Sequence, residues 1–265
     1  MAENLSEVAP KNVVILTSGL SGSSVLAGLV ARAGYWLGDT TKKVGYETFE
    51  NAELVDLDRE ILRRSGFLHE DAGDLPPPSI AAIEAVVREG DSGRFRHFIE
   101  SCSEHEPWLW KDPRLCYTIH FWQKLHDFSD CRFILATRES RQAWTGFVLR
   151  GKVNMPWERY LEIQENDQKS AERFIERNGI RPHTVAFEDL ILHPERVLDE
   201  LNSFLGTHLS MTDFEAIYRG KVGRLRWTHG DFLRARAKVA IAGLVGRGVT
   251  FPQTPPVTPA AHRPS

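Results

Sequence analysis

A β-branched run that leads straight into a glycine- and serine-rich turn and then into a helical pattern constrains the fold most strongly. Residues 12–17, NVVILT, are typical of a buried parallel strand. Residues 18–24, SGLSGSS, form the turn, and from Val25 the apolar residues recur at helical spacing until Gly34. A strand, a glycine-rich turn and a helix in this order predict a P-loop-like opening of a β-α-β unit.

Strand-like and helical segments continue to alternate along the chain. Further strands are predicted over residues 132–137 and 183–187, and a short apolar segment covers 108–110. Helical spacing predicts helices at 54–62, 80–88, 115–126, 157–177 and 194–204. Strands separated by helices imply parallel pairing with right-handed crossovers. We therefore expect an α/β fold with three layers and a mostly parallel central sheet.

The length of 265 residues fits one medium-sized domain with short additions. We expect this domain to cover residues 12–250, after an N-terminal arm over 1–11. Residues 251–265 are rich in Pro and Thr and are predicted to form a flexible tail. The 33 basic and 36 acidic residues give a net charge of −3, which argues against a nucleic-acid partner.

The three cysteines favour a reducing compartment. Cys102, Cys116 and Cys131 form no CxxC pair and leave an odd thiol, so a disulfide framework is not expected. The first residues are acidic where a signal peptide would carry a basic end, and no apolar stretch approaches about 20 residues. We therefore expect a cytoplasmic protein with no transmembrane segment.

The glycine- and serine-rich turn is a candidate anion site, because the start of a helix presents unpaired N–H groups and about half a positive charge. Gly19 and Gly22 would let the backbone approach a ligand, which we expect to be a phosphate or sulfate group. The hydroxyls of Ser21, Ser23 and Ser24 would add donors. The alternative is an ordinary turn whose small residues serve packing. A Walker A loop is excluded because Ser23 stands where that loop needs Lys.

Two more polar clusters follow apolar segments of the chain. Residues 111–114, KDPR, follow the segment at 108–110, and Arg138 follows the strand predicted at 132–137. Ligands of open α/β sheets bind beyond the carboxyl ends of the strands. We therefore expect both clusters to lie near the turn.

Six short segments occur in a fixed order between residues 12 and 206. They are TSGLSGSS (17–24), GYETFEN (45–51), KDPRL (111–115), a strand ending in Arg with a hydroxyl downstream (132–145), WERY (157–160), and FEDL with FLG (187–190 and 204–206). In this order they resemble the motifs of the sulfotransferase family, in particular its bacterial and carbohydrate-type members. The resemblance implies an α/β enzyme that moves a sulfuryl group from 3′-phosphoadenosine 5′-phosphosulfate to a hydroxyl of a sugar, lipid or small metabolite, with no metal.

The resemblance also implies which residues hold the nucleotide donor. The turn would contribute Gly19, Leu20, Ser21, Gly22, Ser23 and Ser24. Arg138 and Thr145 would contact the 3′-phosphate, and Lys221 and Arg224 belong to a basic loop near the carboxyl end of the chain. The interval from Arg138 to Thr145 is one residue shorter than usual in the family. A salt bridge from Arg138 to Glu139 or Glu188 is the alternative, and the late basic residues could form a solvated loop.

The resemblance implies that a glutamate acts as general base towards the acceptor hydroxyl. We favour Glu50 over Glu47, and the alternative is that one of them caps the helix that follows. Lys111 and Arg114 would stabilise charge during transfer. Otherwise Asp112 could cap the next helix, with the proline after it at the first helical position.

Leu20 departs from the family pattern, which has Arg or Lys at this place in the loop. Lys42, Lys43 or Lys111 could supply the missing charge. One alternative to sulfuryl transfer follows from this departure: a non-catalytic homologue that binds a nucleotide or anion. A further alternative, outside this family, is a small-molecule kinase with an atypical phosphate loop.

Overall fold

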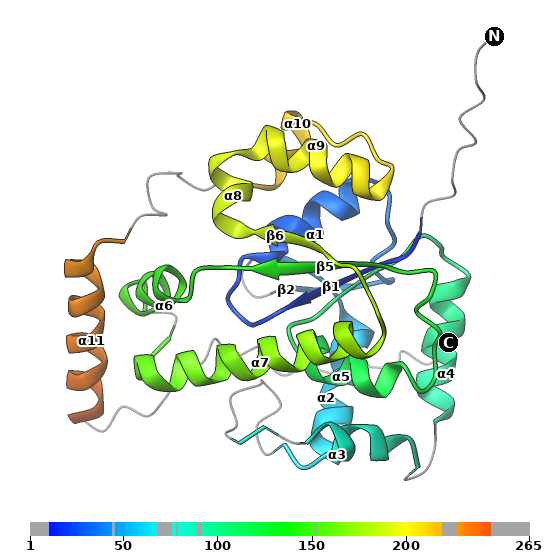
Figure 1. Ribbon diagram of the computed structural model, residues 1–265, viewed down its shortest axis with the longest axis horizontal. Coiled ribbons are helices and arrows are strands. Elements are labelled where there is room, and N and C mark those ends of the chain that lie inside the picture. Colours follow the sequence, from blue (N-terminus) through cyan, green and yellow to red (C-terminus); the bar gives the residue numbers. More distant parts are fainter. Residues whose placement is uncertain are drawn as a thin grey trace, which may run out of the picture.

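The computed structural model describes residues 11–43, 46–67, 76–77, 79–88, 92–151, 153–218 and 227–244. The predictions for Lys221 and Arg224, for residues 1–10 of the arm and for the tail at 251–265 lie outside the described residues. In the described part, a parallel sheet lies between two layers of helices (Figure 1). The prediction of a three-layer α/β fold is confirmed.

The central four-stranded sheet has the order β4-β1-β5-β6, and each neighbouring pair is parallel. The strands are β1 (Val13–Thr17), β4 (Leu109–Lys111), β5 (Arg132–Thr137) and β6 (His183–Ala186). β1 pairs with both β4 and β5 and is buried along its whole length, as its unbroken apolar run requires. The three predicted strands are therefore present, and the apolar segment at 108–110 belongs to the fourth.

Helices cover both faces of this sheet. One layer contains α1 (Ser23–Arg32), α8 (Phe187–Leu192), α9 (Pro194–Leu205) and α10 (Met211–Ile217). The other contains α2 (Ala52–Arg64), α3 (Ile80–Ala85), a 3-10 turn at Val86–Arg88, α4 (Gly93–Ser103), α5 (Leu115–Trp122) and α7 (Trp157–Arg177).

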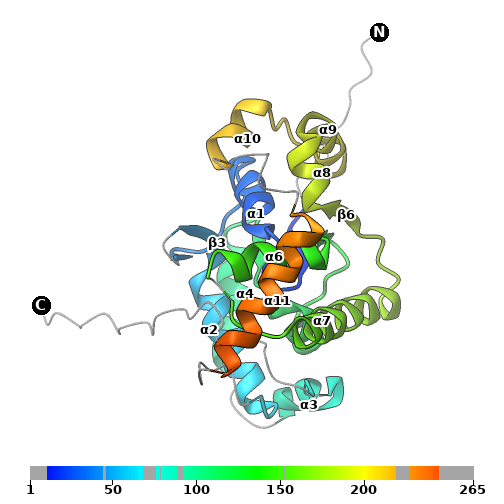
Figure 2. The ribbon, with the colours of Figure 1, turned by 90° about the vertical axis from the view of Figure 1, so that its left-hand side faces the viewer.

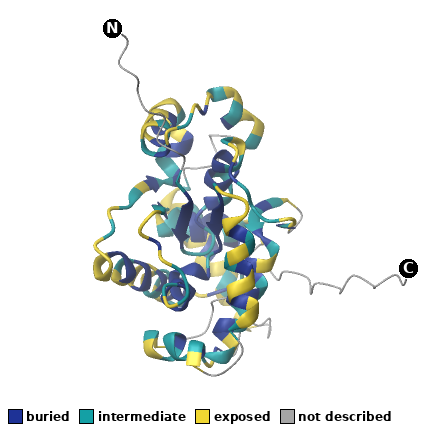
Figure 3. Cartoon of the chain, turned by 90° about the vertical axis from the view of Figure 1, so that its right-hand side faces the viewer, coloured by how far each residue is buried: buried dark blue, intermediate teal, exposed yellow. Residues whose placement is uncertain are grey.

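Side chains of β1 alternate between the two cores, since successive residues of a strand point to opposite faces. Val13 and Ile15 pack in the core with α1 and α8–α10, whereas Val14 and Leu16 pack in the core with α2–α5 and α7. Figure 3 shows the buried residues concentrated around the sheet and on the inner sides of the helices. The sheet is therefore held rigidly, with its carboxyl ends at one side of the molecule.

Two helices lie beyond those carboxyl ends. α6 (Ser140–Leu149) follows β5, and α11 (His229–Leu244) lies across it (Figure 2). Their contact is aromatic: the rings of Trp144 and Phe232 are 5.4 Å apart. A third apolar cluster joins α6, α11 and the first turns of α7. This cluster borders the site described below.

No sequence pattern predicted the antiparallel ribbon formed by β2 (Thr41–Lys43) and β3 (Glu47–Asn51). The ribbon is irregular, because Phe49 has a φ of 55° and packs against Gly28 of α1. Asn51 ends the ribbon and caps α2, since its Oδ1 accepts the N–H groups of the next helix turn at 3.0 and 3.3 Å. The alternative that a glutamate of this segment caps α2 is therefore wrong.

Candidate functional site

The turn between β1 and α1 is shaped by Gly22 and Ser21. Gly22 has a φ of 82°, and a Cβ on it would lie 2.4 Å from the ring of Phe187. Only glycine fits this position. The Ser21 hydroxyl is hydrogen-bonded to that of Thr17 and accepts the N–H of Ser23 at 3.3 Å. The turn thus leads the chain sharply from the sheet into α1.

The start of α1 faces a cavity of about 670 Å³. Within the described residues, α1 has no side-chain cap and no acidic residue in its first turn. Ser23 and Ser24 of this turn line the cavity together with residues 19–22. An uncapped helix start presents N–H donors and the positive end of the helix dipole, which together favour an anion.

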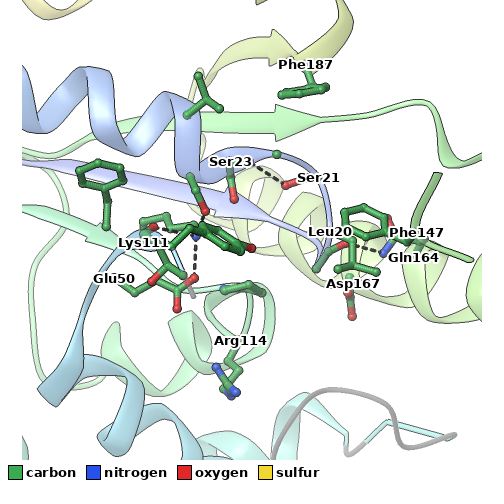
Figure 4. A pocket seen from close by; sticks show the side chains of 18 of the residues that line it. Leu20, Ser21, Ser23, Glu50, Lys111, Arg114, Phe147, Gln164, Asp167 and Phe187 are labelled. Carbon is green, nitrogen blue, oxygen red and sulfur yellow. Dashed lines mark hydrogen bonds and ion pairs between the residues drawn. The ribbon is translucent and has the colours of Figure 1, made fainter. Parts of the chain in front are cut away.

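Lys111 of β4 supplies a buried cation next to this helix start. Its Nζ lies 3.5 Å from Ser24 Oγ and 2.6 Å from Glu50 Oε1, and it also donates to the carbonyl of Thr48 at 3.4 Å. Figure 4 shows Lys111 between Glu50 and the turn. Lys111 is only 2% exposed, so its charge acts inside the cavity and is weakly screened by water.

The other two lysines that could replace the missing loop charge lie elsewhere. Lys43 is exposed and forms an ion pair with Glu47 at 3.6 Å. Lys42 is buried but does not line the cavity, and burial lowers the pKa of its ammonium. Of the three candidates, Lys111 is the one at the start of α1.

β3 directs the two predicted glutamates to different partners. Glu50 contacts Lys111 inside the cavity. Glu47 accepts the N–H of Phe49 at 3.1 Å and pairs with Lys43 at the rim. Both side chains line the cavity, but only Glu50 has the buried cation as a direct partner.

Arg114 lines the cavity below Lys111 (Figure 4) and is anchored by Asp112. Asp112 Oδ1 accepts the N–H of Arg114 at 3.0 Å and its Nη1 at 2.9 Å. α5 begins at Leu115, so Asp112 holds the turn before the helix, and Pro113 does not occupy the first helical position. The KDPR segment therefore combines both interpretations: Asp112 stabilises the turn, Lys111 places its ammonium in the cavity, and Arg114 lines the cavity while its guanidinium pairs with Asp112.

Arg138 lies directly behind the turn. Its Nη1 donates to the carbonyl of Leu20 at 3.3 Å, and its guanidinium stacks on Phe187 at 4.5 Å. Its Nε is 3.8 Å from Glu188 Oε1, so the salt-bridge alternative also describes this side chain. Arg138 does not line the cavity, and neither does Thr145, which is fully buried in α6.

Two residues of α7 that no sequence motif indicated hold the turn from the other side. Gln164 Nε2 donates to the carbonyl of Gly19 at 3.1 Å, and its Oε1 accepts the Ser18 hydroxyl at 2.6 Å. The carboxyl group of Asp167 lies near the Gly19 N–H and the Tyr117 hydroxyl, and both groups favour its charged form. Burial nevertheless raises the pKa of Asp167 to about 8.

The sequence carries a signal for the role of Gln164 and Asp167. Gln164 and Asp167 follow Tyr160 and Ile163 at the spacing of one helix face, and this face is buried and mostly apolar. Polar residues on such a face must find partners in the core. Here the partners belong to the candidate anion-binding turn.

The chain was compared with known protein families, curated proteins and solved structures. No protein-family model and no curated protein matches the sequence. The sulfotransferase domain from the curacin biosynthetic pathway superposes with a TM-score of 0.51 and 17% identity, over 84% of this chain and 82% of that one. This chain has a sulfotransferase fold. The resemblance of the sequence segments is thereby confirmed at the level of the fold.

Two other solved sulfotransferases are also similar. The sulfotransferase domain from the Synechococcus PCC 7002 olefin synthase matches with a TM-score of 0.46 and 18% identity, over 95% of this chain and 90% of that one. The sulfotransferase STF9 from Mycobacterium avium matches with a TM-score of 0.43 and 12% identity, over 92% of this chain and 78% of that one.

No group of three or more His, Cys, Asp or Glu side chains among the described residues could hold a metal ion. No helix of this part of the sulfotransferase fold combines the length and apolar character that crossing a membrane requires.

Proposed function

We propose that the protein is a sulfotransferase that transfers the sulfuryl group of 3′-phosphoadenosine 5′-phosphosulfate to the hydroxyl group of an acceptor. The observation that supports this function best is the buried Lys111 ammonium beside Ser24, at the uncapped start of α1. Together they offer an anionic donor the positive potential that Leu20 does not supply. The sulfotransferase fold agrees with this function.

Transfer would proceed by displacement at sulfur. The acceptor oxygen forms a bond to sulfur while the bond between sulfur and the 5′-phosphate oxygen breaks. Glu50 would take the acceptor proton on Oε2, because its Oε1 already accepts from Lys111. Lys111 and Arg114 would stabilise the negative charge on the departing phosphate oxygen. The products are a sulfate ester, 3′-phosphoadenosine 5′-phosphate and a proton, which Glu50 releases to water.

The nucleotide would be held by the turn and by Arg138. We propose that a 3′-phosphate replaces the carbonyl of Leu20 as partner of the Arg138 guanidinium, with the Thr145 hydroxyl as a further donor. Lys221 and Arg224 are proposed to contact the same nucleotide. This arrangement needs Arg138 and the turn to be neighbours, and their contact at 3.3 Å meets that condition.

A non-catalytic nucleotide-binding protein is the second candidate, because Leu20 replaces the basic residue of the loop. Two measurements distinguish the candidates. Calorimetry with 3′-phosphoadenosine 5′-phosphate tests binding, and transfer of radiolabelled sulfate to a pool of hydroxylated acceptors tests activity. Binding with transfer is the expected result. Binding without transfer to any acceptor would favour the second candidate, and magnesium-dependent binding of ATP in place of this nucleotide would favour a kinase.

A further inference from the structure

One side of the cavity is apolar. Leu20, Phe147, Val153, Met155, Tyr160 and Ile163 line it, and they come from the turn, from α6, from the segment after α6 and from α7. The same side chains belong to or pack against a single hydrophobic cluster. In Figure 4, Leu20 and Phe147 lie together at one side of the cavity, while Glu50 and Lys111 lie at another. The cavity therefore has a charged region and an apolar region.

Leu20 joins the two regions. It has a φ of 68°, a conformation that leucine rarely adopts, and its carbonyl is held by Arg138. Its backbone belongs to the anion-binding turn, and its side chain packs against the apolar cluster. A lysine or arginine at this position would bring a charge to the apolar side. Leucine instead extends the apolar lining of the cavity up to the turn.

Among the residues that the structure describes, few polar groups are available on this side of the cavity. Gln164 is already bonded to Ser18 and Gly19. Tyr160 and Asp167 line the cavity, and each has a buried oxygen, Oη and Oδ1, without a hydrogen-bond partner among the described residues. A ligand with hydroxyl groups all around it would lose hydrogen bonds to water here without replacement. A hydrocarbon with one or two polar groups would not lose hydrogen bonds in this way.

We propose that the apolar region binds the body of the sulfuryl acceptor, and that this acceptor is an alcohol with a hydrocarbon chain or ring system rather than a sugar. The inference rests on the proposed function, because it assigns the apolar region to the acceptor of that reaction. The hydroxyl of the alcohol reaches Glu50, and its hydrocarbon part contacts Leu20, Phe147 and Ile163. Tyr160 and Asp167 bind any further polar group that the acceptor carries.

Calorimetry on the full chain with butan-1-ol, hexan-1-ol, octan-1-ol and glucose, without sulfate donor, tests the binding part. Affinity should rise by about fourfold for each added methylene group, as expected for transfer from water to an apolar site. The heat-capacity change of binding should become more negative along the series. Glucose should bind more weakly than every alcohol. Equal affinities for butan-1-ol and octan-1-ol, or tighter binding of glucose, would overturn the proposal.

A matched pair of variants locates the binding. Ile163→Ala shortens a side chain of the cavity, and Ile241→Ala makes the same change on α11 at a residue that is 60% exposed. The first should weaken octan-1-ol binding roughly 16-fold, the equivalent of two methylene groups, and the second should leave it unchanged. Equal effects of both variants would place the alcohol elsewhere and contradict the proposal. Leu20→Lys gives a second readout should Ile163→Ala not fold, and it should also weaken octan-1-ol binding.

Failure of the two proposals can be distinguished. Sulfuryl transfer to a sugar, without binding of alcohols that depends on chain length, would reject the hydrocarbon acceptor and keep the sulfotransferase. Chain-length-dependent binding in a protein that transfers no sulfuryl group to any alcohol would reject the acceptor role of the apolar region. The supporting result is octan-1-ol both bound more tightly than butan-1-ol and sulfated at a higher kcat/KM.

Discussion

Lys111 Nζ lies 2.6 Å from Glu50 Oε1, and the two side chains are only 2% and 12% exposed. They come from β4 of the central sheet and from β3 of the antiparallel ribbon. Removing one partner of a buried ion pair leaves the other charge buried without compensation, and this is costly. The pair therefore links the ribbon to the sheet and fixes both charges beside the start of α1.

Glu50→Gln should lower the rate of sulfuryl transfer by about 100-fold or more, the usual contribution of a general base. Glutamine keeps the hydrogen bond from Lys111 but cannot take the acceptor proton. The affinity for 3′-phosphoadenosine 5′-phosphate should stay the same. Steady-state kcat and calorimetric Kd measure the two effects separately.

Glu47→Gln is the comparison for that experiment. Glu47 contacts the N–H of Phe49 and the exposed Lys43, so we expect its loss to change kcat only slightly. If Glu47→Gln abolished transfer while Glu50→Gln remained active, the base assignment would pass to Glu47.

Lys111→Met should weaken binding of the nucleotide by about 1.5–3 kcal/mol, the range for a hydrogen bond to a charged group. Methionine keeps most of the volume but removes the cation beside Ser24. Lys43→Met is the matched control, because Lys43 is 71% exposed and pairs only at the rim. Calorimetry should show the loss in the first variant alone. Equal affinities for Lys111→Met and the unmodified protein would remove Lys111 from the anion site.

Arg138→Ala should weaken nucleotide binding by about 1–3 kcal/mol. The guanidinium stabilises the carbonyl of Leu20 before binding and is proposed to meet the 3′-phosphate afterwards. The loss should therefore be smaller for adenosine 5′-phosphate, which lacks that phosphate. Arg141→Ala is the control, because Arg141 lies in the first turn of α6 and its guanidinium stacks on Phe232 of α11. Loss of the same size for both nucleotides would show that Arg138 only supports the turn.

The sequence predicted the elements that depend on local pattern. β1, β5 and α7 coincide with predicted segments because each carries an uninterrupted apolar or helical period. The position of Lys111 near the turn also followed from the sequence, since parallel strands end at one edge of a sheet. These features need no knowledge of distant contacts.

The rest of the site depends on contacts between distant segments, which one sequence does not reveal. Asp167 lies far along the chain from Gly19, and its role follows only from the packing of α7 beneath the turn. The ribbon at 41–51 contains a residue of positive φ, so neither a helical nor a strand period describes it. Arg138 contacts the turn, but it does not line the cavity, and its guanidinium stacks on Phe187.

Asp167 should make the protein less stable as pH rises. Its pKa is about 8 in the folded protein and 3.8 in the unfolded chain, so between these values the folded state binds more protons. The free energy of unfolding therefore falls with increasing pH across this window, by up to about 1.4 kcal/mol per pH unit, and is constant above it. Asp167→Asn cannot ionise and should lose this contribution. Relative to the unmodified protein, the variant should gain stability from pH 5 to pH 8.

Urea unfolding at pH 5, 6.5 and 8 measures this difference. Asp130→Asn is the control, because the Asp130 side chain is 91% exposed and lies far from the turn in the fold. Burial also raises the pKa of Asp58, so some pH dependence should remain in Asp167→Asn. Unfolding free energies of Asp167→Asn that parallel those of the unmodified protein at all three pH values would contradict the assignment.

Gly22→Ala should disrupt the turn, whereas Gly19→Ala should not. A Cβ at residue 22 would lie only 2.4 Å from the ring of Phe187, and alanine there would have to adopt a φ of 82°. A Cβ at residue 19 would meet no atom within 4 Å. We expect Gly22→Ala to cost about 1–3 kcal/mol of unfolding free energy and to weaken binding of 3′-phosphoadenosine 5′-phosphate. Gly19→Ala should keep the free energy of unfolding. Because both substitutions add the same methyl group to the same turn, equal losses in the two variants would mean that the contact between Gly22 and Phe187 does not shape the anion site.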